Sequence, residues 1–101
     1  MNILERLPEI TDRIIETSHP EKIILFGSYA RGDFSADSDL DLLIIIPGVK
    51  HLRAENVRVR RALRGLLVPI DVIIATPEQI ERLGNVKGLV YQTALADGKV
   101  V

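Results

Sequence analysis

The sequence predicts an α/β (α+β) fold in which a small mixed three-stranded sheet is flanked by about four helices. Three short aliphatic runs have the length of buried strands, and the segments between them repeat apolar residues at helical spacing. With 101 residues, 47% of them hydrophobic, we expect one packed domain spanning residues 1–101. Because only 4% of the residues are aromatic, Ile, Leu and Val must form its core.

The N-terminal part of the chain is predicted to form a helix and a strand. Residues 2–17 repeat Ile and Leu at helical spacing, with Pro8 as a local perturbation. The helix ends before Pro20, because the residue before a proline avoids the helical conformation. The run KIILFG (22–27) is a short buried strand closed by a glycine, and a helical turn or loop follows over residues 28–38.

The remaining segments alternate between strands and helices. LDLLIII (40–46) is the second strand, and residues 51–67 form an amphipathic helix with its arginines outward. PIDVIIAT (69–76) is the third strand, and its last residue, Thr76, is a good N-cap for the helix that follows. Gly84–Asn85 divides the C-terminal region into two helical pieces.

The unusual residues can share one end of the sheet. A helical crossover joins the second and third strands, which favours a parallel pair. Gly27 and Ser28 lie at the exit of the first strand, whereas Asp39, Asp41 and Asp71 lie at the entrances of the other two. All five residues can lie at the same end of the sheet only if the first strand runs antiparallel to the other two.

Three carboxylates form the candidate catalytic and metal site. Asp39 and Asp41 are two residues apart and project to one face, and Asp71 would bring a third carboxylate to that face. Such oxygen ligands suit Mg²⁺, and two ions about 4 Å apart would stabilise the attacking and leaving oxygens of a phosphoryl or nucleotidyl displacement. We expect Asp39 and Asp41 to hold the metals, and Asp71 to hold the ion nearer the nucleophile and to accept its proton. Taken singly, these aspartates also fit turn or surface positions.

Three further residues are candidates for nucleotide binding. Gly27 and Ser28 let backbone and hydroxyl approach a triphosphate, since glycine has no Cβ in the way. Arg31 either approaches a phosphate or forms an ion pair with a nearby aspartate that shapes the loop.

The combined motif resembles a known family. GSYARG followed by SDLDLLIII places ten residues between Gly-Ser and Asp-x-Asp, as in the nucleotidyltransferase superfamily related to DNA polymerase beta. More narrowly, the whole chain resembles the minimal nucleotidyltransferases of bacteria and archaea. The resemblance implies the polymerase beta-like fold, Mg²⁺, a nucleoside triphosphate donor such as ATP, and a site at Asp39, Asp41 and Asp71. It also implies a helical HEPN-family partner in a toxin–antitoxin pair, with AMP transferred to a tyrosine of that partner.

Two other functions stay open from the sequence. The chain could neutralise a HEPN partner by binding alone, or it could act on a small-molecule alcohol after completing its site by oligomerisation. The sequence does not rank catalysis above binding. The apolar C-terminal end fits a partner, a second copy of the chain, or packing within the chain.

Composition excludes several classes. The absence of Cys rules out disulfides, Cys-ligated zinc and thiol catalysis. No signal peptide or stretch of ~20 apolar residues is found, so we expect a cytoplasmic protein without membrane contact. Residues 33–41 are acidic and residues 50–64 are basic, which fits a metal–phosphate ligand or two solvated faces. No aromatic residue interleaves with the basic segment, so nucleic-acid stacking is not expected.

Overall fold

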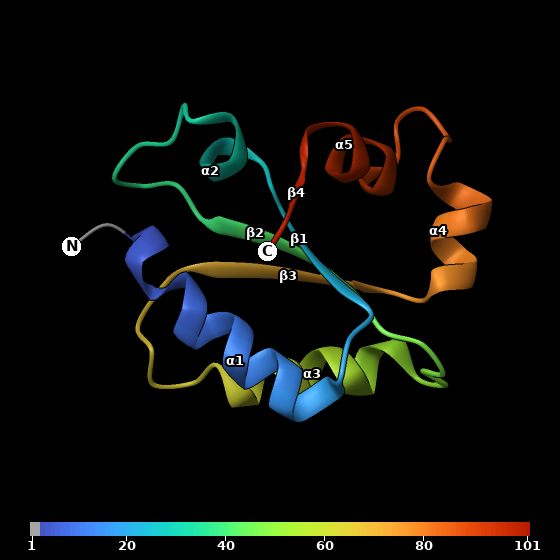
Figure 1. Cartoon of the computed structure of the whole chain (residues 1–101), viewed down its shortest axis with the longest axis horizontal. Coiled ribbons are helices and arrows are strands. Elements are labelled where there is room, and N and C mark those ends of the chain that lie inside the picture. Colours follow the sequence, from blue (N-terminus) through green and yellow to red (C-terminus); the bar gives the residue numbers. More distant parts are fainter. Residues whose placement is uncertain (1–2) are drawn as a thin grey trace.

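The computed structural model describes residues 3–101, so Asn2, where the first helix was predicted to begin, lies outside the described residues. Helices and strands alternate along the chain (Figure 1). Their order is η1 (Ile3–Arg6, a 3-10 turn), α1 (Leu7–Ser18), β1 (Lys22–Phe26), α2 (Ser28–Arg31), β2 (Leu40–Ile45), α3 (Leu52–Ala62), β3 (Ile70–Ala75), α4 (Pro77–Leu83), α5 (Val90–Asp97) and β4 (Lys99–Val100).

The sheet is mixed and has the order β3-β2-β1-β4. β1 runs antiparallel to β2, and β2 runs parallel to β3, as the positions of the unusual residues required. The predicted α/β class is therefore confirmed, but the described residues contain four strands and five α-helices rather than three and about four.

The additional strand comes from the C-terminal end. Val100 pairs with Ile24 of β1, and the backbone N–H of Val101 donates to the carbonyl of Ile23 at 2.9 Å. Of the alternatives for this end, packing within the chain is the one observed. The side chain of Val100 nevertheless remains 67% exposed, because β4 lies at the edge of the sheet.

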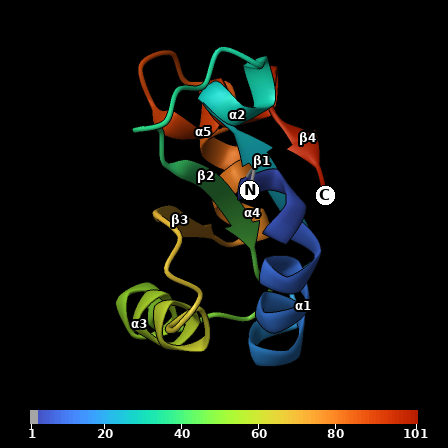
Figure 2. The same cartoon turned by 90° about the vertical axis from the view of Figure 1, so that its left-hand side faces the viewer.

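Helices cover both faces of the sheet. α1 and α3 lie on one side, whereas α4 and α5 lie on the other (Figure 2). Leu40, Leu42 and Ile44 of β2 are fully buried against the first pair of helices, while Leu43 of the same strand packs into a separate cluster with Ala94 of α5. Burial of each such side chain contributes about 1.5–3 kcal/mol, so the sheet is held from both sides.

Local sequence signals explain where two of the helices begin and end. Thr76 caps α4 as predicted: its hydroxyl accepts from the N–H of Gln79 at 3.2 Å, and the Gln79 side chain accepts from the Thr76 N–H at 2.9 Å. The amphipathic helix is shorter than predicted, because α3 ends at Ala62. Gly65 then adopts a positive φ of 92°, which turns the chain back toward β3.

No helix within residues 3–101 combines the length and the apolar character that a membrane crossing requires.

Candidate active site

The end of β1 and the beginnings of β2 and β3 lie together at one end of the sheet (Figure 2). Asp41 lies between its two register partners, Phe26 on β1 and Asp71 on β3. Paired residues on neighbouring strands project to the same face, so Asp41 and Asp71 present their carboxylates side by side. Asp39 lies just before β2, two residues from Asp41. The structure thus brings the three predicted aspartates to one end of the sheet.

Asp41 is the least exposed of these aspartates, and its electrostatic surroundings are distinctive. Burial raises the pKa of the Asp41 carboxyl, and the negative charges of Asp71 and Asp39 raise it further. The positive charge of Arg31 lowers the same pKa. Four of the predicted residues therefore lie close enough to act on one another electrostatically, and a cation among the carboxylates would relieve their repulsion.

Gly27 lies directly against Asp41. A Cβ added at Gly27 would collide with the Oδ2 atom of Asp41. Gly27 also has a φ of 74°, in the region that favours glycine. Two independent reasons therefore require glycine here, and one of them concerns a carboxylate of the candidate site. The half-buried Ser28 begins the next helix, α2.

Arg31 ends α2 and is partly committed to its own loop. Its Nε donates to the Oδ2 of Asp33 at 3.2 Å, and both side chains are exposed. The ion pair that the sequence offered as one interpretation is therefore present. Because the charge of Arg31 also acts on Asp41, the residue is placed beside the candidate site as well.

Two hydrogen-bonded side chains of α3, Asn56 and Arg60, link this helix to β3 and Asp71, and the sequence did not predict this contact. Asn56 donates from Nδ2 to the backbone carbonyl of Val72 at 3.1 Å and accepts from the Nε of Arg60 at 2.6 Å. Arg60 in turn places Nη2 3.9 Å from the Oδ1 of Asp71. The spacing of Asn56 and Arg60 along a helix was the available signal, but it becomes informative only once α3 is placed beside β3.

The donor chemistry of the site fits Mg²⁺. Carboxylate oxygens are the ligands this ion prefers, and a bound cation would oppose both the burial and the neighbouring negative charges that raise the pKa of Asp41. Within residues 3–101, however, no three His, Asp or Glu side chains stand ready around a single point. The three aspartates share an end of the sheet without a common coordination point.

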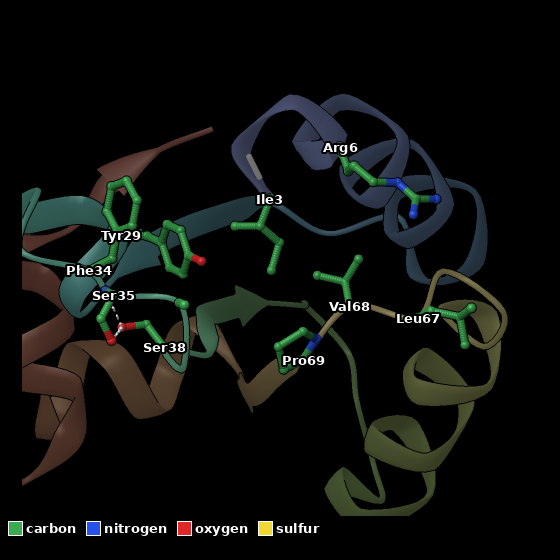
Figure 3. A pocket seen from close by; sticks show the side chains of 10 residues that line it. Ile3, Arg6, Tyr29, Phe34, Ser35, Ser38, Leu67, Val68 and Pro69 are labelled. Atoms are coloured by element: carbon green, nitrogen blue, oxygen red, sulfur yellow. Dashed lines mark hydrogen bonds between the residues drawn. The ribbon is translucent and has the colours of Figure 1, made fainter. Parts of the chain in front are cut away.

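A pocket of about 660 Å³ opens at the same end of the molecule but on the other face of the sheet (Figure 3). Tyr29 and Phe34 stack in it with ring centroids 4.4 Å apart. Tyr29 also packs against the cluster that contains Leu40 and Leu42, opposite the face of Asp41. None of the six predicted site residues lines this pocket, whose walls are Ile3, Arg6, Tyr29, Phe34, Ser35, Ala36, Ser38, Leu67, Val68 and Pro69.

Comparison with known proteins places the chain in a family. The sequence profile of the family described as "Nucleotidyltransferase domain" matches residues 4–97. Two proteins of Methanocaldococcus jannaschii, both named "putative protein adenylyltransferase", are similar to this chain. One is 35% identical over 77 residues, covering 74% of this chain and 77% of that protein. The other is 68% identical over 25 residues, or 25% of each.

Solved structures share the fold. The crystal structure of a "putative nucleotidyltransferase" from Sulfolobus solfataricus superposes with a TM-score of 0.67 and 27% identity, covering 96% of this chain and 77% of that one. A structure described as a "toxin-antitoxin with AMP-PNP" superposes with a TM-score of 0.61 and 20% identity, covering 88% and 69%. With nearly the whole chain matched by the family's profile, the chain belongs to the nucleotidyltransferases.

Proposed function

We propose that this nucleotidyltransferase moves AMP from ATP, with Mg²⁺, to a hydroxyl group on a partner protein. The observation that carries the proposal is the position of Asp41 between Gly27 and Asp71. Asp41 is then flanked on one side by Gly27, which leaves room for phosphates, and on the other by Asp71, whose carboxylate can take a proton.

Each residue of the site has a role in this proposal. Asp39, Asp41 and Asp71 would hold Mg²⁺, and Gly27 and Ser28 would receive the triphosphate. When bound, the ion supplies positive charge for the phosphates and stabilises the attacking and leaving oxygens. Arg31 adds a fixed positive charge on the same side.

The transfer balances without any further reactant. The acceptor oxygen forms a bond to the α-phosphorus of ATP, while the bond from that phosphorus to the oxygen bridging to the β-phosphate breaks. Pyrophosphate leaves, and the acceptor proton moves to the carboxylate of Asp71. Asp71 suits this task because it lies on the edge strand and is exposed.

A protein acceptor is favoured by the names of the similar proteins. The two Methanocaldococcus jannaschii relatives are named for protein adenylylation. The structure described as a toxin–antitoxin with AMP-PNP has the same fold and pairs a nucleotide analogue with such a system. We therefore propose that the acceptor is a tyrosine of a helical HEPN-family toxin, and that this chain acts as its antitoxin.

The test uses α-labelled ATP, Mg²⁺ and the protein encoded by the neighbouring gene, which the proposal expects to be of the HEPN family. We expect label on that partner with the native chain, and a loss of at least ~100-fold with Asp41→Ala or Asp39→Ala, since each removes a metal ligand. Asp12→Ala, which removes an exposed carboxylate from α1, is the matched control and should label normally. Equal labelling by native chain and Asp41→Ala would refute the proposal. A complex that still forms with Asp41→Ala while no chain transfers label would show a binding-only antitoxin.

A further inference from the structure

A groove runs between α3 and the free edge of β3 and leads to Asp71. We infer that this groove binds an acidic segment of the protein that carries the acceptor hydroxyl. The inference rests on the proposed function, because it assigns the side from which the acceptor approaches the site.

The walls of the groove are largely apolar and its edge strand is unpaired on one side. Among the described residues β3 pairs with β2 alone, so its other edge faces α3 and solvent (Figure 2). The groove has a volume of about 400 Å³, and Val57 in it is 43% exposed. Its lining residues are Leu52, Arg53, Asn56, Val57, Val72, Ile73 and Ile74. An exposed apolar surface beside a strand edge is typical of polypeptide binding.

Positive charge borders the groove. Within α3 the only acidic residue, Glu55, pairs with Arg58 at 3.1 Å. Arg53, on the wall of the groove, has no ion-pair partner in the part of the chain that the structure describes. Arg60 lies one turn beyond Asn56 and is exposed as well, and its ion pair with Asp71 is long, at 3.9 Å, so its guanidinium can also face a bound carboxylate. Carboxylates of a bound segment would therefore meet guanidinium groups near both ends of the groove, which is the charge complementarity that selects an acidic partner.

The groove is continuous with the candidate active site. Asn56 lines the groove and binds the guanidinium of Arg60, which reaches toward Asp71. Asp71 is on the outermost strand, so the groove lies on the side of it away from Asp41 and Gly27. With the triphosphate over Gly27, an acceptor held in this groove would approach the site past Arg60 and Asp71.

The lining favours a polypeptide over a single-stranded nucleic acid. No aromatic residue lines the groove, and none occurs in α3, so bases would find no stacking surface. The exposed side chain of Val57 can instead pack against an apolar residue of a bound peptide that has an acidic residue on either side.

The probe is a labelled synthetic peptide of about nine residues with Glu and Val alternating around a central Tyr, which at ~3.3 Å per residue is longer than the groove, so it can fill the groove and extend beyond both of its ends. Amide chemical shifts of the isotope-labelled protein report where it binds, and fluorescence anisotropy reports how tightly. We expect shifts in α3 and β3, and binding at least ~10-fold weaker with the double variant Arg53→Glu/Arg60→Glu. A peptide with Lys in place of Glu should bind the native chain poorly and bind the double variant better, which excludes misfolding as the cause.

Arg82→Glu is the matched control, since it reverses an exposed charge in α4 and should change the affinity by less than ~2-fold. Equal binding of the Glu and Lys peptides, shifts centred on Tyr29 and Phe34, or a stronger response to a single-stranded RNA would overturn the inference. A separate titration with Mg²⁺ and ATP tests the proposed function alone. Changes in the amide chemical shifts of Gly27 and Asp41 without peptide binding in the groove would refute only the inferred role of the groove. Peptide binding without nucleotide binding would refute the proposed function.

Discussion

The side chains on the two faces of β2 have different environments. On the face toward α1 and α3, Leu40, Leu42 and Ile44 are all fully buried, so this face is apolar from its first residue. On the other face, Asp41 occupies the first position and Leu43 packs into the second apolar cluster only two residues later. One strand therefore contributes to the core along its whole length on one side, and divides between the core and the candidate active site on the other.

The difference shows how a small domain accommodates buried charge. The continuous face holds the strand in register, so the alternate face can carry a carboxylate that burial and two neighbouring aspartates disfavour. A site of this kind costs stability locally, and the apolar face opposite offsets that cost. The contrast between the two faces can be tested by substitutions on each of them.

Truncation in the apolar core should have the largest effect. Leu42→Ala and Leu43→Ala remove fully buried side chains from opposite faces, and we expect each to lower the free energy of unfolding by about 2–5 kcal/mol. Chemical denaturation measures both. If Leu43→Ala cost less than ~1 kcal/mol, the second face would contribute little to the core and the contrast would need revision.

The next effect concerns ligand binding on the carboxylate face. With Mg²⁺ and ATP at about 100 times their dissociation constant, the native chain should gain about 2.7 kcal/mol of stability, because only the folded state binds them. Asp41→Asn should abolish most of this gain, and thermal unfolding with and without ligand measures it. An unchanged gain in the variant would mean that the nucleotide binds elsewhere.

Gly27→Ala tests the close approach between the turn and Asp41. Gly27 has φ 74° and ψ −155°, a conformation essentially restricted to glycine that costs a residue with a Cβ roughly 1–3 kcal/mol, and the new methyl group would also displace the Asp41 carboxylate. We expect lower stability together with weaker nucleotide binding. Gly32→Ala is the comparison variant, because Gly32 also has a positive φ, 88°, in the left-handed helical region, but has open space around the added atom. Equal loss of nucleotide binding in both variants would argue against a special role for Gly27.

Removal of the α4 cap should have a smaller effect, away from the site. Thr76→Ala leaves the N–H of Gln79 without its side-chain acceptor, which should cost about 1 kcal/mol. Denaturation measures the loss, and nucleotide binding should be unchanged. A variant that lost nucleotide affinity would show that α4 influences the carboxylate end of the sheet.

The smallest effect is expected on the pH dependence of the stability of the metal-free protein. Because the folded-state pKa of Asp41 is raised, the folded chain holds that proton more tightly than the unfolded chain does. The resulting stability is present below the unfolded-state pKa and is lost as the pH rises through the folded-state pKa. Asp41→Asn should reduce this loss and raise the Tm near neutral pH in the presence of EDTA. A lower Tm for the variant across the whole pH range would contradict the assignment.

Much of the fold and of the site's placement could be predicted because the decisive signals are local. Aliphatic runs located β1, β2 and β3, and the alternation of side chains along a strand put Asp39 and Asp41 on one face. The antiparallel direction of β1 followed from requiring Gly27 and the aspartates to share an edge, and the structure confirms that direction. The catalytic and metal roles of these residues remain predictions.

The amino-acid sequence by itself determined β1, β2, β3 and the main helices, and it indicated the family, because periodicity and a closely spaced motif are properties of neighbouring residues. Only the tertiary structure decided that Lys99–Val100 would join the sheet, since a strand of two residues has no periodicity and forms only against β1. It alone also brought Asn56 and Arg60 of α3 to β3 and Asp71. Contacts between distant segments depend on how helices dock on the sheet, and that docking is decided by the packing of the whole core.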